Sequence, residues 1–119
     1  LLGLVGSEMC IRDRNIIAWQ HYMGTTECLT SKAISKYAAP IFANDLHGLP
    51  STYIAVGDVD LFLDEDINYS ERLEAAGIGI QLEIFKGGFH AFEFLVPSAK
   101  ISKLARATHS SAISAALFD

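Results

Sequence analysis

Residues 51–90 read STYIAVGDVDLFLDEDINYSERLEAAGIGIQLEIFKGGFH. Ser51–Gly57 is a nearly continuous apolar run, rich in β-branched and aromatic residues, which predicts a strand covered on both faces. Ile67–Ala76 follows an acidic turn and places apolar side chains at helical spacing, which predicts a helix. Ile80–Phe85 alternates apolar and polar residues and predicts a second strand. The stretch therefore encodes a strand, a helix and a further strand.

The flanking sequence extends this pattern in both directions. Ser98–Leu117 predicts a long helix, and residues 16–23 predict a short one that ends at Gly24. The resulting βαβα order implies parallel strands joined by a right-handed crossover, hence an α/β fold. Because two strands do not make a stable sheet alone, we expect an incomplete sheet from the C-terminal part of a larger one. The covered stripe of the long helix is predicted to consist of Ile101, Leu104, Ala105, Thr108, Ala112 and Ala116.

Composition limits the classes of function that the chain can serve. Its 119 residues suffice for one modest domain, and a hydrophobic share of 50% excludes intrinsic disorder. No apolar run reaches the roughly 18 residues needed to span a bilayer. A formal net charge of −5 argues against a nucleic-acid partner. Cys10 and Cys28 make neither a disulfide framework nor a metal site, which favours a reducing compartment, by default the cytoplasm.

Two loops that follow the predicted strands carry the candidate chemistry. Residues 57–65, GDVDLFLDE, follow the first strand, and residues 87–92, GGFHAF, follow the second. The carboxyl ends of adjacent parallel strands lie at one sheet edge, about 4.8 Å apart, so Asp60 and His90 can meet there. An Asp–His pair is the supporting half of a nucleophilic triad. We therefore predict a distance of roughly 2.6–3.2 Å between an Asp60 carboxylate oxygen and a His90 ring nitrogen.

Three segments carry a family resemblance: YAAPIFANDLHGLPSTYIAVGDVDLFLDE from Tyr37, YSERLEAAG from Tyr69 and GGFHAFE from Gly87. Together they resemble the hormone-sensitive-lipase-like branch (alpha/beta hydrolase fold-3) of the α/β-hydrolases, which comprises esterases and lipases. The resemblance implies that Asp60 is the triad acid and His90 the triad base. It also implies hydrolysis of a small-molecule carboxylic ester through a serine acyl-enzyme, without cofactor or metal.

The sequence departs from this family at several points. Ala91 stands where the family usually has glycine after the catalytic histidine. No G-x-S-x-G nucleophile motif and no His-Gly-Gly oxyanion loop occur in the 119 residues. We therefore expect a parent protein that hydrolyses esters and a chain that is inert by itself.

Simpler interpretations of the same residues stay open. Asp60 could cap the following helix, and His90, between two phenylalanines, could be a packed core histidine. Asp64 and Glu65 are predicted to be helix N-terminal charges, whereas Asp58 receives no role beyond a possible bond to turn backbone. The other three histidines are predicted to lie at the surface or to serve packing: His21, His47 and His109.

Two other classes of function are alternatives to the hydrolase. One is a magnesium-dependent phosphoacceptor domain, suggested by Asp58, Asp60 and Lys86, but the further acid pair that it needs after an earlier strand is missing. A calcium loop fails because its sixth position is Leu63 and its twelfth is Tyr69. The second alternative, apart from these metal-dependent sites, is a non-catalytic α/β binding module.

Leu1–Arg14, LLGLVGSEMCIRDR, fits nothing that follows it. Its SEMCIRDR portion resembles translated sequencing-adapter DNA, so we expect a non-native leader that makes few contacts; a short native helix is the alternative. Because position 1 is not methionine, we expect the chain to start within a longer protein. Residues 15–119 are then the C-terminal part of an α/β-hydrolase domain.

Overall fold

The computed structural model describes residues 15–24 and 34–118, which fall into two compact units divided after Ala43. In the first unit, residues 15–23 form a helix that ends at Gly24, whose φ of 67° is left-handed, as the sequence predicted. The same unit contains a short 3-10 helix, η1 (Pro40–Phe42). Segments 1–14 and 25–33, with both cysteines and the predicted leader, lie outside the described residues.

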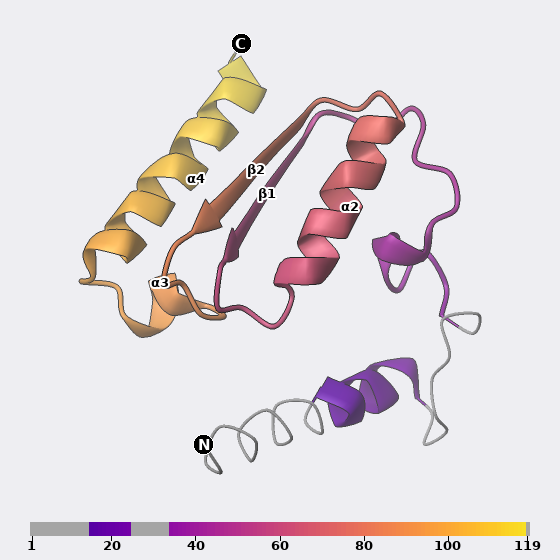
Figure 1. The fold of residues 1–119 in the computed structure, drawn as a ribbon, viewed down its shortest axis with the longest axis horizontal. Helices are drawn as coiled ribbons and strands as arrows, with labels where there is room; N and C mark the ends of the chain where they lie inside the picture. Colours follow the sequence, from indigo (N-terminus) through magenta and orange to yellow (C-terminus); the bar gives the residue numbers. More distant parts are fainter. Residues whose placement is uncertain (1–14, 25–33, 119) are drawn as a thin grey trace. The chain divides into compact units, whose positions relative to one another are not determined.

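The second unit contains the predicted strand–helix–strand–helix order with one addition (Figure 1). The two strands pair in parallel, in a register that runs from Thr52 opposite Ile80 to Gly57 opposite Phe85. The addition is a four-residue helix between the second strand and the long helix. The elements are β1 (Thr52–Gly57), α2 (Leu63–Ala75), β2 (Ile80–Phe85), α3 (Phe92–Leu95) and α4 (Lys100–Phe118).

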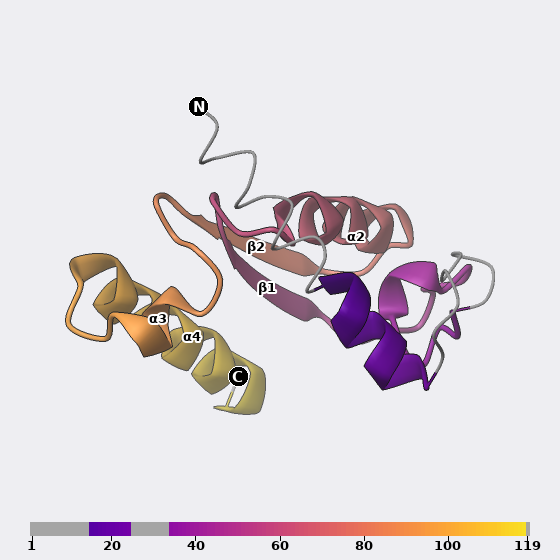
Figure 2. The same ribbon diagram turned by 90° about the horizontal axis from the view of Figure 1, so that it is seen from below.

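The helices cover the strand pair from both sides (Figure 2). On one face, α2 packs through Leu73, which is fully buried. On the other face, Phe85, Phe92 and Ala105 form a buried cluster that joins β2, α3 and α4. Coverage on both faces accounts for the near-continuous apolar character of β1.

The predicted covered stripe of α4 is partly wrong. Leu104 is 60% exposed and Ala116 is exposed as well, whereas Ser102 is fully buried. The Ser102 hydroxyl donates a hydrogen bond of 3.3 Å to the carbonyl oxygen of Phe92, so its burial leaves no polar group unpaired. His109 lies on the packed side too, with its ring edge-on to Tyr53. The contact surface of β2 and α3, rather than the hydrophobicity of α4, selects the buried face.

No helix among the described residues is long and apolar enough to cross a membrane.

Candidate active site

Backbone contacts bring together the two loops that follow β1 and β2. The Asp58 N–H donates to the carbonyl oxygen of Phe85 at 3.1 Å, and the Val59 N–H donates to that of Gly88 at 3.0 Å. Pairing thus continues past the last residues of the ladder. As a consequence, both loops leave the sheet at the same edge and in contact with each other.

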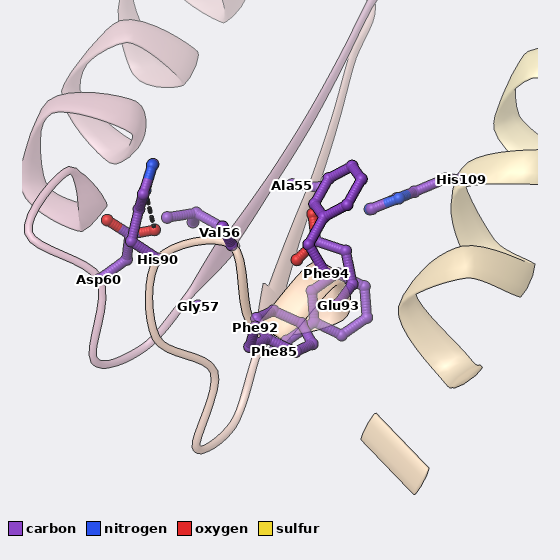
Figure 3. A pocket seen from close by; sticks show the side chains of 11 residues that line it. Ala55, Val56, Gly57, Asp60, Phe85, His90, Phe92, Glu93, Phe94 and His109 are labelled. Atoms are coloured by element: carbon purple, nitrogen blue, oxygen red, sulfur yellow. Dashed lines mark hydrogen bonds and ion pairs between the residues drawn. The ribbon is translucent and has the colours of Figure 1, made fainter. Parts of the chain in front are cut away.

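Asp60 and His90 form the predicted pair at this edge (Figure 3). Nδ1 of His90 lies 3.0 Å from Oδ2 of Asp60, although thirty residues separate them in the chain. The Asp60 side chain is 9% exposed and that of His90 is 62% exposed. The predicted distance is therefore confirmed, with the carboxylate nearly covered and the imidazole open to solvent.

Asp60 uses its two oxygens for different partners. Oδ1 accepts the backbone N–H of Phe62 at 3.1 Å, which braces the turn before α2, and Oδ2 is left for His90. Of the two interpretations that the sequence left open, the histidine contact occurs, whereas the helix cap does not: the N-cap residue of α2 is Phe62, and no side-chain hydrogen bond caps the helix. The Phe62 ring also stands edge-on to the imidazole, with 5.2 Å between centroids. The turn that positions the acid therefore also supports the histidine ring.

This geometry determines what the imidazole can do. A carboxylate only accepts hydrogen bonds, so Nδ1 donates to Asp60 in the neutral imidazole and Nε2 keeps a free lone pair. The ionised carboxylate also stabilises the imidazolium that forms when Nε2 takes up a proton. The pair is therefore built to accept a proton at Nε2 and to release it again.

A hollow of about 300 Å³ borders the pair and continues along the face of β1 toward α4 (Figure 3). Four of its other lining residues are aromatic: Phe85, Phe92, Phe94 and His109. The histidine thus lies beside a largely apolar recess.

Asp58 is a site residue to which the sequence assigned no role. Its Oδ1 accepts the N–H of Gly87 at 2.6 Å, a contact between the acid loop and the histidine loop. The available signal was an acid directly after one strand and a glycine pair directly after its parallel neighbour. Local sequence could not show that the two would meet.

Four other candidate residues are exposed: Asp64, Glu65, His47 and His21. Asp64 and Glu65 are exposed in the first turn of α2, as expected for helix N-terminal charges. His47 pairs with Asp45 at 2.8 Å within one exposed loop, and His21 is exposed. In residues 15–24 and 34–118, no three His, Cys, Asp or Glu side chains are grouped as a metal site requires.

Asp66 is the neighbouring acid whose ionisation the site disfavours. Burial raises its pKa above the ordinary value of 3.8, and the negative charges of Asp60 and Glu65 raise that pKa further. Negative charge close to Asp60 is therefore already in excess.

Residues 5–94 match the family model described as alpha/beta hydrolase fold. The chain belongs to this family. The family resemblance and the α/β-hydrolase fold predicted from the sequence are thereby confirmed. The match begins within segment 1–14, whose non-native origin stays a prediction.

Several solved structures and curated proteins are similar to the chain. The esterase LipW from Mycobacterium marinum superposes with a TM-score of 0.77 at 31% identity, over 87% of this chain and 31% of that one. A bacterial heroin esterase superposes with a TM-score of 0.69 at 40% identity, over 73% of this chain and 27% of that one. Neutral cholesterol ester hydrolase 1 of Rattus norvegicus is 42% identical over 55 residues, which are 44% of this chain. The match spans 14% of that relative's length.

Proposed function

We propose that this chain supplies the acid and the base of the catalytic triad of a carboxylic-ester hydrolase. The observation that carries the proposal is the contact of 3.0 Å between Asp60 and His90 across the edge of a parallel strand pair. It is supported by similarity to proteins named as an esterase, a heroin esterase and a cholesterol ester hydrolase. The substrate class is a small-molecule carboxylic ester, and the reaction needs no cofactor.

The reaction proceeds through proton transfers at Nε2 of His90, two during acylation of the serine and two during hydrolysis of the acyl-enzyme. The imidazole first removes the proton of a serine hydroxyl as that oxygen attacks the ester carbonyl. It then returns the proton to the departing alcohol, which leaves an acyl-enzyme. A water molecule, deprotonated in the same way, then attacks the acyl carbonyl, and His90 passes this proton to the serine oxygen as the carboxylic acid leaves. Throughout, Asp60 stays ionised, orients the ring and stabilises the imidazolium.

The serine and its oxyanion donors have no counterpart in this sequence, because neither G-x-S-x-G nor a His-Gly-Gly loop occurs in it. We therefore propose that residues 15–119 act as the C-terminal part of an α/β-hydrolase domain, after a non-native leader at residues 1–14. The nucleophile then belongs to the part of the domain that precedes them.

A chimera tests the proposal. Residues 37–94 of this chain would replace the matching segment of the bacterial heroin esterase, to which the chain is 40% identical. We expect the chimera to hydrolyse p-nitrophenyl butyrate. Within it, Asp60→Asn should lower kcat by about 10⁴, because it removes the carboxylate that holds the tautomer, and His90→Ala should lower it at least as much.

The same segment contains a matched control. Asp45 and His47 form a second Asp–His pair, with side chains 78% and 77% exposed, inside a single loop. Asp45→Asn and His47→Ala should leave kcat within a few-fold of the unmodified chimera. A folded chimera that is inactive, or one that keeps its activity after His90→Ala, would overturn the proposal in favour of a binding module.

A further inference from the structure

We infer that Asp58 is a positioning residue for His90: its carboxylate holds the loop that carries the base. The inference deepens the proposed function and rests on it for the role of His90. Within the described second unit, the Asp58 side chain makes no hydrogen bond to the imidazole or to Asp60. It acts through a single contact, the 2.6 Å hydrogen bond that its Oδ1 accepts from the N–H of Gly87.

The location of this contact lets it influence the position of His90 relative to Asp60. Asp58 precedes Asp60 by two residues, and Gly87 precedes His90 by three. The bond therefore joins the two loops a few residues before the acid in one loop and the base in the other. Gly87 has a φ of +80°, which glycine adopts without steric penalty. The hydrogen bond from its N–H to the Asp58 carboxylate stabilises this conformation.

The imidazole depends on such outside support. It is 62% exposed, so surrounding side chains do not enclose it. Its interaction partners, the carboxylate of Asp60 and the edge-on ring of Phe62, both belong to the loop after β1. His90 itself belongs to the loop after β2. The distance between the acid and the base is therefore set by how firmly the two loops are joined.

Apart from the bond between Asp60 and His90 itself, the bond between Asp58 and Gly87 is the hydrogen bond of that junction that a side chain supplies. The other two links, from the N–H groups of Asp58 and Val59, are backbone bonds that any residue except proline could supply. A carboxylate that accepts a backbone N–H forms a charge-assisted bond, stronger than a neutral one. Removal of the Asp58 side chain should therefore free Gly87 while β1 and β2 stay paired.

The position of the proton on the His90 ring reports this positioning directly. A neutral imidazole in water favours the proton on Nε2, whereas the bond to Asp60 holds it on Nδ1. Long-range ¹H–¹⁵N spectra of the ¹⁵N-labelled, 119-residue chain distinguish the two tautomers at neutral pH. In the unmodified chain we expect the Nδ1–H form and a downfield Gly87 amide proton.

Three variants of Asp58 distinguish the effect of its hydrogen bond to Gly87 from the effect of having any side chain at this position. Asp58→Ala should move the Gly87 amide upfield, speed its hydrogen exchange at least tenfold and convert His90 to a mixture of tautomers. Asp58→Asn, whose amide oxygen can still accept from Gly87, should keep the tautomer close to that of the unmodified chain. Asp58→Glu keeps the charge but displaces the acceptor by one methylene, so it should give an intermediate ratio.

The matched control is Asp64→Ala, which removes an exposed acid from the same acidic segment and should change neither signal. Dispersed amides from β1 and β2 verify that each variant is folded, and Asp58→Glu decides the question should Asp58→Ala not fold. An unchanged tautomer in a folded variant whose Gly87 amide has moved would overturn the inference, as would an unmoved Gly87 amide in folded Asp58→Ala. The spectra require no ester hydrolysis, so an inactive chimera with a responsive tautomer would overturn the proposed function alone.

Discussion

Gly57 and Gly88 lie backbone against backbone where β1 and β2 end. A Cβ added to Gly57 would overlap the carbonyl oxygen of Gly88. A Cβ added to Gly88 would lie 3.0 Å from the Cα of Gly57 and 2.9 Å from the ring of Phe92. The loops that carry Asp60 and His90 can approach so closely because neither glycine has a side chain.

Gly57→Ala should therefore lower the free energy of unfolding by about 2–3 kcal/mol, since the new methyl group meets backbone that cannot rotate away. Urea denaturation of the chain measures the change. Gly79→Ala is the matched control, because its Cβ would meet the flexible Ser51 hydroxyl at 3.1 Å, and the change should stay within about 0.5 kcal/mol. Equal effects of the two substitutions would contradict the close packing of the glycines.

Ala91→Gly should stabilise the chain by about 0.5–1 kcal/mol. Ala91 has a φ of 59°, a left-handed conformation that is strained for any residue with a Cβ, and it stands where the family usually has glycine. The midpoint of denaturant unfolding should rise accordingly. Ala75→Gly, within α2, should lower the midpoint instead, because glycine there only adds flexibility. A lower midpoint for Ala91→Gly would contradict strain at this position.

Asp66→Asn should stabilise the chain at neutral pH and lose that effect in acid. An acid whose pKa is raised by folding binds protons more tightly in the folded state, so its ionisation opposes folding at high pH. The gain should be largest at pH 7 and should disappear as the pH falls below the ordinary value of 3.8.

Thermal unfolding between pH 3 and pH 7 measures this dependence. Asp64→Asn is the control, because it removes an exposed acid from the same helical turn and should show no such gain. A benefit of Asp66→Asn that does not vary with pH would point to some cause other than ionisation.

The chain by itself should not hydrolyse p-nitrophenyl acetate or butyrate. An Asp–His pair can polarise a hydroxyl, but the sequence supplies no nucleophile motif and no oxyanion loop. The loss of one oxyanion donor alone lowers rates by about 10²–10³. The test compares the purified chain with its His90→Ala variant, and turnover above that variant would reveal another nucleophile.

Elements with strong local patterns were predictable within a few residues. The alternation of IQLEIF predicts β2 with the bounds that it has, Ile80–Phe85. The helix before it starts earlier than predicted, at Leu63 instead of Ile67, because its acidic first turn shows no apolar period. The four-residue helix α3 was not predicted, since it is shorter than one apolar repeat and follows the left-handed Ala91.

Some features of the inward-facing and site residues were likewise predictable from the sequence, and others were not. Parallel pairing of two recognisable strands suffices to bring Asp60 and His90 to one edge, because strand direction determines where each following loop emerges. Hydrophobicity along α4 did not reveal that Ser102 and His109 face inward, since that depends on the surfaces of β2 and α3.

Local pattern therefore determines the strands, the helices and the edge at which the acid and the base meet, because propensity and periodicity act over a few neighbouring residues. Only the tertiary structure decides that one oxygen of Asp60 braces its turn while the other faces His90. It alone also joins Asp58 to Gly87, 29 residues away. Such contacts depend on how closely two loops pack, and that distance is set by atoms far apart in the chain.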